Sequence, residues 1–531
     1  MRRFICHSRA LFHPLLLGGI LHPFQHPVCP REDLPSPHLP VLHLPSTKDG
    51  YFPLLGQTPN LIKQTSPVSL YLKWANLHPT SPFIRVLGIF NSETLLVVTP
   101  EAHKEILHTH CYSFIKPDIM KRYLSDFLGE RGVLFLEGDE HKFVRRQLNS
   151  IFSLQSVKKI MPVFQKRAGD LTAYFEKRLD QNGIGEFDIN TVYSKATIDV
   201  TGAAILGVEL GNLTDSTGDT DFLTAFHRLF MQPPLSAIIS FINLQVPIRR
   251  FLPFVKANTE YLAAGQNTRE MTTRVVRRRM TEIKEGNSAK NISEGADLLT
   301  MMIENEQNFK EGGELTEHEI VDQILTFLAA SHETSADAML WASFVLATRP
   351  DIQSKLRGEI LGFLQSNPNK VPGFNDIESL RYLNNFIREI LRLYSPAIQT
   401  FRESIRDLAI CGQVIPKGTV LHLLPSVAST LTTVWGEDGE EFVPERWDDL
   451  PKAAAEHPYA WSPFLGGPRI CPGKQFALTE LKVFLMELVP RFRFKMTEDM
   501  EGLQGKMPRT KNPASSYRLA EGNFVRLERI Y

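Results

Sequence analysis

The feature that most constrains this chain is a ten-residue loop, 464–473, which reads FLGGPRICPG. Gly467 and Gly473 permit backbone angles and close approaches that a side chain would forbid, and the prolines stiffen the loop. An apolar run over residues 474–488 predicts a helix directly after it. The loop N–H groups and the helix N-terminus favour the anionic form of the Cys471 thiol, a strong soft ligand for iron. The loop is therefore suited to hold a haem iron through its cysteine, which is one of the standard haem ligations.

Taken alone, a cysteine in a glycine-rich turn before a helix is more often a buried structural residue. The wider pattern combines an aromatic residue, two glycines and a cation with the cysteine, at Phe464, Gly467, Arg469, Cys471 and Gly473. Together these residues resemble the haem-binding signature of the cytochrome P450 family. The resemblance implies that Cys471 is the axial ligand to the iron of haem b, with Phe464 and Gly473 in the binding site. Arg469 is placed to pair with a haem propionate.

The size and composition of the chain bound its architecture. A chain of 531 residues exceeds the usual size of one domain, so two domains are the default expectation. After about residue 50 there is no low-complexity linker and no internal repeat, which favours one large, mostly helical domain over residues 51–531. The net charge is zero, so nothing indicates a nucleic-acid partner. The five cysteines are widely spread, which argues against a disulfide framework and favours a reducing compartment.

Residues 1–50 differ from the rest, since they hold six histidines and eight prolines. The charge-free run 10–30 is long enough to suggest a membrane segment, but His-Pro pairs interrupt it. Only residues 11–24 are convincingly apolar, which is short for a bilayer span. A signal peptide is a poorly formed alternative. We expect a degenerate membrane anchor or a disordered leader, whereas fungal and animal cytochromes P450 usually carry a clean N-terminal transmembrane helix.

An acid followed by an alcohol stands inside a long helical pattern, 317–347, at Glu333 and Thr334. One interpretation is that Thr334 bonds back to a carbonyl of the preceding turn while Glu333 pairs with a lysine or arginine. The other is a proton relay for the cleavage of dioxygen. The stretch resembles the oxygen-activation motif of the family, which implies a catalytic role for both residues. Ser331 stands where the family usually has glycine, and it would narrow the space for oxygen or add a hydroxyl to the relay.

Three further basic residues are candidates for haem binding. The pattern over residues 138–146 predicts a helix on which His141 and Arg145, four positions apart, share a face. A solvated basic face is the simpler interpretation of that pair. The resemblance to the family implies instead that both face a haem propionate, and that Arg402 reaches a propionate as well.

A predicted helix over residues 380–394 carries Glu389 and Arg392, three positions apart and flanked by apolar residues. Most such pairs are surface salt bridges of little energetic value. Partial burial is plausible here, and a buried pair needs a further partner. The resemblance implies that Arg446 is that partner, in a structural ion-pair triad that braces the haem loop and has no part in the chemistry.

Short strands are predicted near the start of the domain and after the helix that ends at residue 394. Residues 83–90 and 94–99 read as two strands with a turn at 91–92. Residues 414–420 read as a hairpin with its turn at 416–418.

The resemblance covers about residues 50–531 and is that of a eukaryotic, fungal-type microsomal cytochrome P450. It implies a mainly α fold, a helical prism with small β-sheets, with haem b between the long central helix and the cysteine loop. The implied reaction inserts one oxygen atom of O2 into an apolar small-molecule substrate. Electrons would come from NADPH–cytochrome P450 reductase, docked near Lys142, Arg146 and Lys474, at the cytosolic face of the endoplasmic reticulum membrane.

Two other functions stay open at this point. One is a haem-thiolate isomerase or dehydratase that needs no reductase, which the presence of both Glu333 and Thr334 disfavours. The other is an inactive haem-binding protein, suggested by the unusual leader. The sequence does not determine the substrate, because a terpenoid, polyketide, fatty acid or xenobiotic would each fit an apolar cavity.

Overall fold

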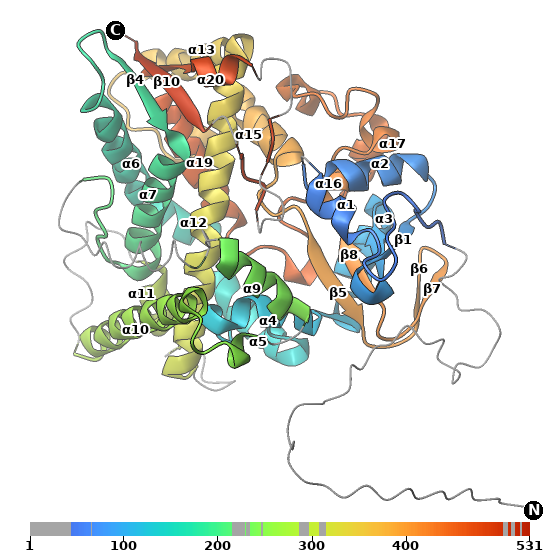
Figure 1. Ribbon diagram of the computed structural model, residues 1–531. Coiled ribbons are helices and arrows are strands. Elements are labelled where there is room, and N and C mark those ends of the chain that lie inside the picture. Colours follow the sequence, from blue (N-terminus) through green and yellow to red (C-terminus); the bar gives the residue numbers. More distant parts are fainter. Residues whose placement is uncertain are drawn as a thin grey trace, which may run out of the picture.

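The fold was analysed in a computed structural model (Figure 1), which describes residues 44–64, 66–214, 229, 234–245, 248–285, 297–306, 315–502, 508–510, 516–520 and 523–530. Residues 1–43, which make up most of the predicted leader, lie outside the described ranges. Within those ranges, no helix combines the length and the apolar character needed to cross a bilayer.

Helices make up most of the structure. The longer ones are α4 (Asp118–Leu128), α5 (Gly138–Ile151), α6 (Leu154–Glu176), α7 (Ile189–Thr201), α9 (Pro234–Gln245), α10 (Lys256–Lys284), α12 (Glu317–Thr348), α13 (Pro350–Ser366), α15 (Arg381–Leu393) and α19 (Lys474–Leu488). The shorter ones are α1 (Thr58–Lys63), α2 (Ser69–Leu77), α3 (Pro100–Lys104), α11 (Leu298–Glu306), α14 (Phe374–Glu378), α16 (Pro425–Ala428), α17 (Thr432–Trp435), α18 (Lys452–Glu456) and α20 (Glu498–Glu501). Single turns of 3₁₀ or π helix are η1 (Ile89–Asn91), η2 (Glu105–Thr109), η3 (Cys111–Ser113), η4 (Gly202–Leu206), η5 (Ile248–Phe251), η6 (Pro444–Trp447) and η7 (Gly467–Arg469).

Helix α12 is the axis of the helical body (Figure 1). It starts with a capping box: the Thr316 hydroxyl accepts from the Glu319 N–H, and the Glu319 carboxylate accepts from the Thr316 N–H at 2.9 Å. Most of its residues are buried on every side, as expected of a helix in the centre of a large domain. Its predicted bounds, 317–347, are confirmed to within one residue.

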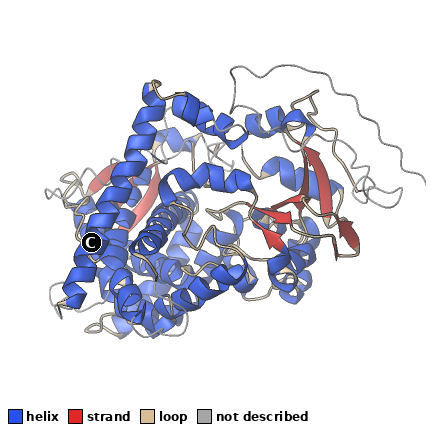
Figure 2. Ribbon diagram, turned by 90° about the horizontal axis from the view of Figure 1, so that it is seen from below, coloured by secondary structure: helices blue, strands red, loops and turns tan. Residues whose placement is uncertain are grey.

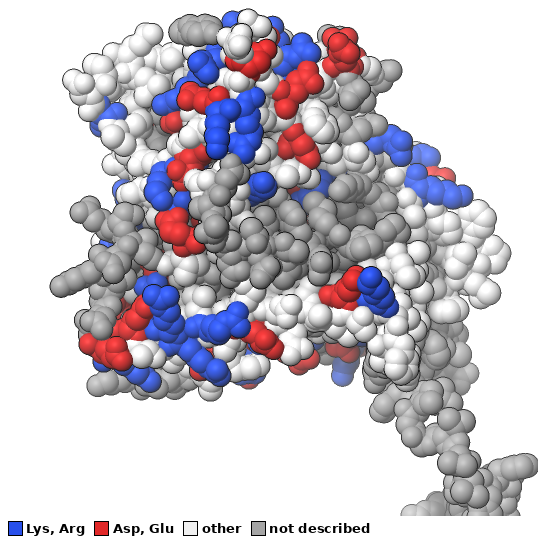
Figure 3. Space-filling view, turned by 60° about the vertical axis from the view of Figure 1, so that its left-hand side comes forward, with Lys and Arg blue, Asp and Glu red and all other residues white. Residues whose placement is uncertain are grey.

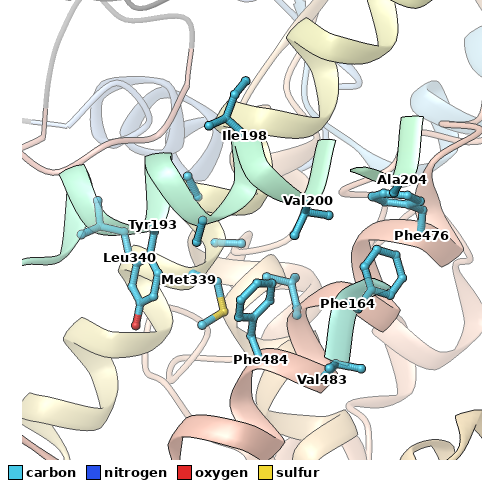
Figure 4. Close-up of a cluster of buried hydrophobic side chains, with 14 of the residues drawn as sticks. Phe164, Tyr193, Ile198, Val200, Ala204, Met339, Leu340, Phe476, Val483 and Phe484 are labelled. Atoms are coloured by element: carbon cyan, nitrogen blue, oxygen red, sulfur yellow. The ribbon is translucent and has the colours of Figure 1, made fainter. Parts of the chain in front are cut away.

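The main core joins α6, α7, α12 and α19 (Figure 4). Phe164 of α6 meets Phe476 of α19 edge to face, with ring centroids 4.8 Å apart. Met339 and Leu340 of α12 lie in the same cluster as Phe484 of α19. The helix that follows the cysteine loop is thereby packed firmly against the central helix.

Small sheets flank the helices on two sides (Figure 2). A five-stranded sheet has the order β1-β2-β8-β5-β3, from β1 (Phe83–Leu87), β2 (Glu93–Val97), β8 (Val420–Leu423), β5 (Thr400–Ser404) and β3 (Phe114–Ile115). A three-stranded sheet has the order β4-β10-β9, from β4 (Ile184–Asp188), β10 (Phe524–Arg529) and β9 (Phe492–Met496). Strands β6 (Leu408–Ile410) and β7 (Gln413–Ile415) form a hairpin.

The strand predictions met different outcomes. The two strands near residues 83 and 94 are confirmed, shorter than predicted, as the antiparallel pair β1 and β2. The hairpin predicted with its turn at 416–418 is wrong, because those residues connect β7 to β8 in another sheet. The hairpin turns instead at Cys411 and Gly412, both of which have positive φ, at 47° and 75°. Glycine after a residue in the left-handed region is a strong hairpin signal.

The ion-pair triad forms as predicted and is fully buried. Arg392 donates to Glu389 through Nε and Nη2, both at 2.8 Å, and Arg446 Nε donates to the same carboxylate at 3.4 Å. The other donors of Arg392 reach the backbone carbonyls of Ser429, Gly439 and Glu441, so all five of its N–H groups are used. Such complete pairing is what a buried ion pair needs to be tolerated.

The triad is connected to the cysteine loop by aromatic contacts. The Trp447 indole donates to Glu389 at 3.0 Å, and its ring meets Trp461 edge to face at 5.1 Å. Trp461 stands three residues before Phe464, at the start of the loop. The triad therefore braces the segment from which the loop emerges.

Basic and acidic side chains alternate over the face shown in Figure 3, with no wide field of one sign. This mixing agrees with the zero net charge of the chain. Exposed pairs on α10, such as Arg278 with Glu282 at 2.8 Å, contribute little to stability individually.

Replacing Arg392 should destabilise the fold strongly, since Arg392→Ala leaves the buried Glu389 carboxylate short of donors. We expect the free energy of unfolding to fall by about 3–5 kcal/mol. A matched control lies on the same helix: Arg381 is 71% exposed and pairs with Asp448, so Arg381→Ala should cost less than about 1 kcal/mol. Urea unfolding followed by tryptophan fluorescence measures both, and equal losses would contradict a special role for the triad.

Candidate active site

The cysteine loop is a short, internally bonded turn. The Cys471 N–H donates to the Phe464 carbonyl at 2.9 Å, and the Phe464 side chain packs against the main core. Helix α19 begins at Lys474, as predicted. Burial raises the pKa of the Cys471 thiol, while the Gly473 N–H and the charges of Arg145 and Lys474 oppose that rise. The groups predicted to favour a thiolate are present, but in the protein alone burial has the larger effect on the pKa of Cys471. A metal ion bound to the sulfur would favour the thiolate further.

The glycines of the loop have different reasons to be there. Gly467 has a φ of 66°, and a Cβ atom on it would lie 2.1 Å from the Leu107 carbonyl oxygen, so glycine is required. Gly466, which the sequence analysis did not single out, would place a Cβ atom 2.4 Å from the Tyr459 ring. The expectation of an unusual backbone angle at Gly473 is wrong, since its φ is −77° and its nearest neighbour would be the Cys471 sulfur at 3.8 Å.

Five basic residues form a buried or half-buried group that we call the basic cluster: Lys116, His141, Arg145, Arg402 and Arg469. They come from the link between β3 and α4, from α5, from β5 and from the cysteine loop. Four of the five were predicted to contact haem. Lys116 was missed, because a lysine before a proline carries no signal in the sequence.

The contacts of the cluster reveal two more residues that sequence reasoning missed. Glu137 accepts from Arg469 Nη2 and from the Lys116 N–H, the latter at 2.9 Å. Tyr112 hydrogen-bonds His141 Nδ1 at 3.2 Å, and the Arg469 guanidinium lies over its ring, 5.4 Å from the centroid. Both residues act across loops that are distant in the sequence, where spacing rules do not apply.

The electrostatics of the cluster are those of cations held close together. Burial, then repulsion from Arg402 and Arg469, lowers the pKa of Lys116 to about 7. Burial and Arg469 lower the pKa of Arg402 to about 10. Burial, with the neighbouring cations, lowers the pKa of His141 to about 3, so this imidazole is neutral.

Charge balance in this cluster is the test of whether a haem fits. Among the described residues, Glu137 is the carboxylate that lies against the basic cluster, close to Arg402, Arg469 and Lys116. Arg145 is the fourth cation of the cluster. The Nε of Arg469 is buried and unpartnered within the described residues. Buried cations in excess need anions, and the two propionates of a haem supply two. Arg145 also lies within electrostatic reach of Cys471, so the cluster and the sulfur belong to one site.

Helix α12 has a few partly exposed residues at its centre, although most of the rest of the helix is buried. Between residues 320 and 347 every side chain is buried except Ala329, Ala330, Ser331 and Thr334, which we call the open patch of α12. The patch contains the alcohol of the predicted motif. These four residues therefore face an accessible space inside an otherwise closed core.

The two predicted catalytic residues make the contacts of the simpler interpretation. The Thr334 hydroxyl donates to the Ala330 carbonyl at 2.6 Å, and Glu333 lies 3.5 Å from the Arg518 guanidinium. These contacts orient both groups but do not test a role in proton transfer. Their participation in a relay stays a prediction.

A buried carboxyl next to the motif was missed by sequence reasoning. Glu480 of α19 accepts from the Ser335 hydroxyl at 2.6 Å, which joins the central helix to the helix after the cysteine loop. Burial raises the pKa of Glu480 to about 8, so the group is largely protonated at neutral pH. In the sequence it is one of two glutamates on an apolar helix, a weak signal for function.

Comparison with known proteins agrees with this site. The family model for cytochrome P450 matches residues 45–516. Cytochrome P450 monooxygenase sphH of Aspergillus fumigatus is 31% identical over 481 residues, covering 86% of this chain and 83% of that protein. Cytochrome P450 monooxygenase ALT8 of Alternaria alternata is 30% identical over 530 residues, covering 87% and 86%. Cytochrome P450 monooxygenase FUM15 of Gibberella moniliformis is 29% identical over 516 residues, covering 87% and 84%.

The matched family model spans most of the chain, and the alignments of this chain with the three fungal monooxygenases cover more than four fifths of each of those proteins. This chain therefore belongs to the cytochrome P450 family, as a haem-iron monooxygenase of the fungal type and hence an oxidoreductase.

Proposed function

We propose that residues 51–531 form one haem b domain that inserts one oxygen atom of O2 into an apolar small molecule, using electrons from an NADPH-dependent reductase. The observation that carries the proposal is the basic cluster beside Cys471. Within the described residues, Arg402, Arg469 and Lys116 lie around one carboxylate, Glu137, and Arg145 lies toward the sulfur. A protein keeps such a surplus of buried charge only for an anionic partner. The leader over residues 1–50 lies outside this domain.

Each residue of the site has a defined task in the proposed function. A haem held by the Cys471 thiolate supplies the chemistry of dioxygen cleavage, because the thiolate pushes electron density onto the iron. Arg402, Arg469 and Lys116 would hold the propionates by charge-assisted hydrogen bonds. Neutral His141 would donate a hydrogen bond to a propionate through one ring nitrogen. Arg145 would lower the free-energy cost of a thiolate at Cys471.

The α12 motif handles protons through a constrained hydroxyl. The single proton of Thr334 points at the Ala330 carbonyl, so its oxygen presents lone pairs to the space in front of the open patch. Thr334 would therefore accept a hydrogen bond from a water or a reacting group before it donates one. Glu333, paired with Arg518 behind the patch, would be the reservoir that recharges such a water.

The haem-thiolate assignment is tested by the carbon monoxide difference spectrum of the reduced protein. The wild type should show a strongly red-shifted Soret band, which Cys471→Ala should abolish because alanine offers no ligand. Cys411→Ala is the matched control, since Cys411 is a free, half-buried cysteine outside the site, and it should keep the band.

A band at the position typical of histidine ligation would overturn the assignment to Cys471. A monooxygenase reconstituted with the reductase should consume NADPH as it forms product. An isomerase or dehydratase that needs no reductase should form product without consuming NADPH.

A docking surface for the reductase is proposed around Lys142, Arg146 and Lys474. Lys142 is half-exposed, pairs with Asp139 at 2.8 Å, and lies 4.7 Å from the centroid of the Tyr112 ring. Since Arg469 covers the same ring, Lys142 stands one aromatic residue away from the basic cluster. A cationic surface so close to the haem site suits an acidic electron donor.

Reversing two charges should weaken this docking. The variant Lys142→Glu with Lys474→Glu should slow reductase association about tenfold at low salt, because steering depends on charge complementarity. Lys256→Glu is the control, since Lys256 is 88% exposed on α10, away from the proposed surface. Stopped-flow reduction by NADPH and reductase measures the effect, and an unchanged rate would exclude this surface.

Contact with a membrane, at the cytosolic face of the endoplasmic reticulum, is proposed from the inverted polarity of α9. The buried face of α9 carries the polar residues Ser236, Ser240 and Asn243, and the backbone N–H of Arg249 donates to the Asn243 side chain at 3.1 Å. The outward face carries apolar residues instead: Leu235 (53% exposed), Ile238 (56%) and Ile242 (39%), with Phe251 (58%) and Phe254 (96%) in the segment that follows. Apolar side chains so exposed call for a covering surface, and lipid is the one we propose.

Flotation with neutral phospholipid vesicles tests this contact. Replacing Leu235, Ile238 and Phe254 together by serine should reduce the vesicle-bound fraction, because the apolar area available for insertion falls. Val371→Ser is the matched control, since Val371 is 74% exposed on a loop after α13, and it should bind as the wild type does. Equal flotation of all three proteins would refute the proposed face.

A further inference from the structure

A side-chain bond between two helices touches the open patch of α12 and bears on how the proposed reaction is controlled. Ser331 Oγ lies 3.0 Å from Oγ1 of Thr201, the last residue of α7. Sequence reasoning left two roles for Ser331: narrowing the space for oxygen, or adding a hydroxyl to a relay. The direction of this hydrogen bond discriminates between them.

The direction follows from counting protons. The Thr201 hydroxyl has one proton and donates it to the Thr197 carbonyl at 2.7 Å. Thr201 can therefore only accept from Ser331, and Ser331 must be the donor. The other acceptor near Ser331, the Leu328 carbonyl, lies 3.5 Å away, at the limit of hydrogen bonding. The proton of Ser331 is thus committed to α7 and is not available to a relay.

The Ser331 bond is one of three side-chain bonds between α7 and α12. His332 Nδ1 lies 3.1 Å from Thr197 Oγ1, and Ser343 Oγ lies 2.6 Å from the Tyr193 hydroxyl. The Ser331 bond differs from the other two because it ends on the open patch. Immediately after Thr201, α7 changes into the π turn η4, a feature common near functional sites.

The segment that the bond secures is weakened from within. Thr334 donates to the Ala330 carbonyl, which is also the helical acceptor for the Thr334 N–H. Such back-bonding competes with the helix ladder and often bends a helix. Because the patch faces accessible space, packing does not hold this turn from the front. The bond to Thr201 holds it from behind.

We propose that Ser331 is a positioning residue: its bond to Thr201 pins the weakened turn of α12 against α7 and so sets the position of Thr334 in the site. The free side of Ser331 offers only lone pairs, so it can accept a hydrogen bond from a bound water but does not drive proton delivery. This inference rests on the proposed function of the site, but the bond itself can be tested without turnover.

The primary test is hydrogen exchange of the haem-loaded enzyme, read by mass spectrometry on peptides covering residues 328–338. Ser331→Ala and Thr201→Val remove the bond from its two ends, and each should speed exchange about fivefold, the value expected for one net hydrogen bond. The double variant should be no faster than either single one, because both remove the same interaction. The conservative variant Thr201→Ser keeps the hydroxyl and should exchange as slowly as the wild type.

A second readout probes the space in front of the patch. The rate of carbon monoxide binding to the reduced enzyme should rise in Ser331→Ala and Thr201→Val and stay at the wild-type value in Thr201→Ser. The matched control is Ser343→Ala, which removes the buried bond to Tyr193 between the same two helices, away from the patch. It should change neither exchange over residues 328–338 nor carbon monoxide binding.

The outcomes separate the inference from the function on which it rests. Wild-type exchange in both Ser331→Ala and Thr201→Val, additive effects in the double variant, or an equal effect of Ser343→Ala would overturn the positioning role. Absence of a thiolate-type carbon monoxide complex from the wild type would instead overturn the proposed function, while the exchange experiment would still decide whether the bond secures α12. Two variants reach the same bond, so failure of one to fold leaves the other.

Discussion

A surplus of buried positive charge beside a half-buried thiol is the constraint on which the rest of this structure depends. Arg402, Arg469 and Lys116 lie close enough to repel one another: burial, and then repulsion from the two arginines, lowers the pKa of Lys116, and Glu137 opposes this shift only in part. Side chains under such repulsion stay in place only if their supports are rigid. A mainly helical body with small sheets supplies that rigidity and leaves the charge for the haem of a cytochrome P450 to neutralise.

The contrast with the Glu389 triad separates structural from functional burial of charge. Around Glu389 every donor of Arg392 is used and no further ligand is needed. Around Arg469 a buried donor stays unpartnered within the described residues, and the cations outnumber the carboxylate. Both clusters combine arginine with glutamate, so composition does not distinguish them. Completeness of hydrogen bonding does, and it can be read only from the folded chain.

Local signals carried the sequence predictions that succeeded. The ends of α12 and α19 were predicted closely because apolar periodicity and, for α19, the preceding glycine-proline loop mark them within a few residues. The hairpin at residues 416–418 was wrong because a Pro-Lys-Gly turn also serves as a connection between sheets, and only strand pairing tells the two apart. The expectation for Gly473 was wrong because its φ is ordinary and a Cβ atom there would meet only the Cys471 sulfur, at a normal contact distance of 3.8 Å. Glu137, Lys116 and Glu480 were missed since their partners lie far away along the chain.

The sequence by itself determined the haem-thiolate loop, the acid–alcohol helix and the Glu389–Arg392 pair, and with them the family, because each is a short pattern whose residues lie within a few positions of one another. Arg446 lies 57 residues from Glu389, so only the resemblance to the family predicted it as the third member of the triad. Tertiary structure alone decided which cations are buried together, which hydroxyl proton points where, and which face of α9 is apolar toward solvent. These properties depend on contacts between segments far apart in the chain, 145 residues for Ser335 and Glu480 and 130 residues for Ser331 and Thr201. A hydroxyl becomes a donor or an acceptor according to the partner that folding brings to it, and no local pattern encodes that choice.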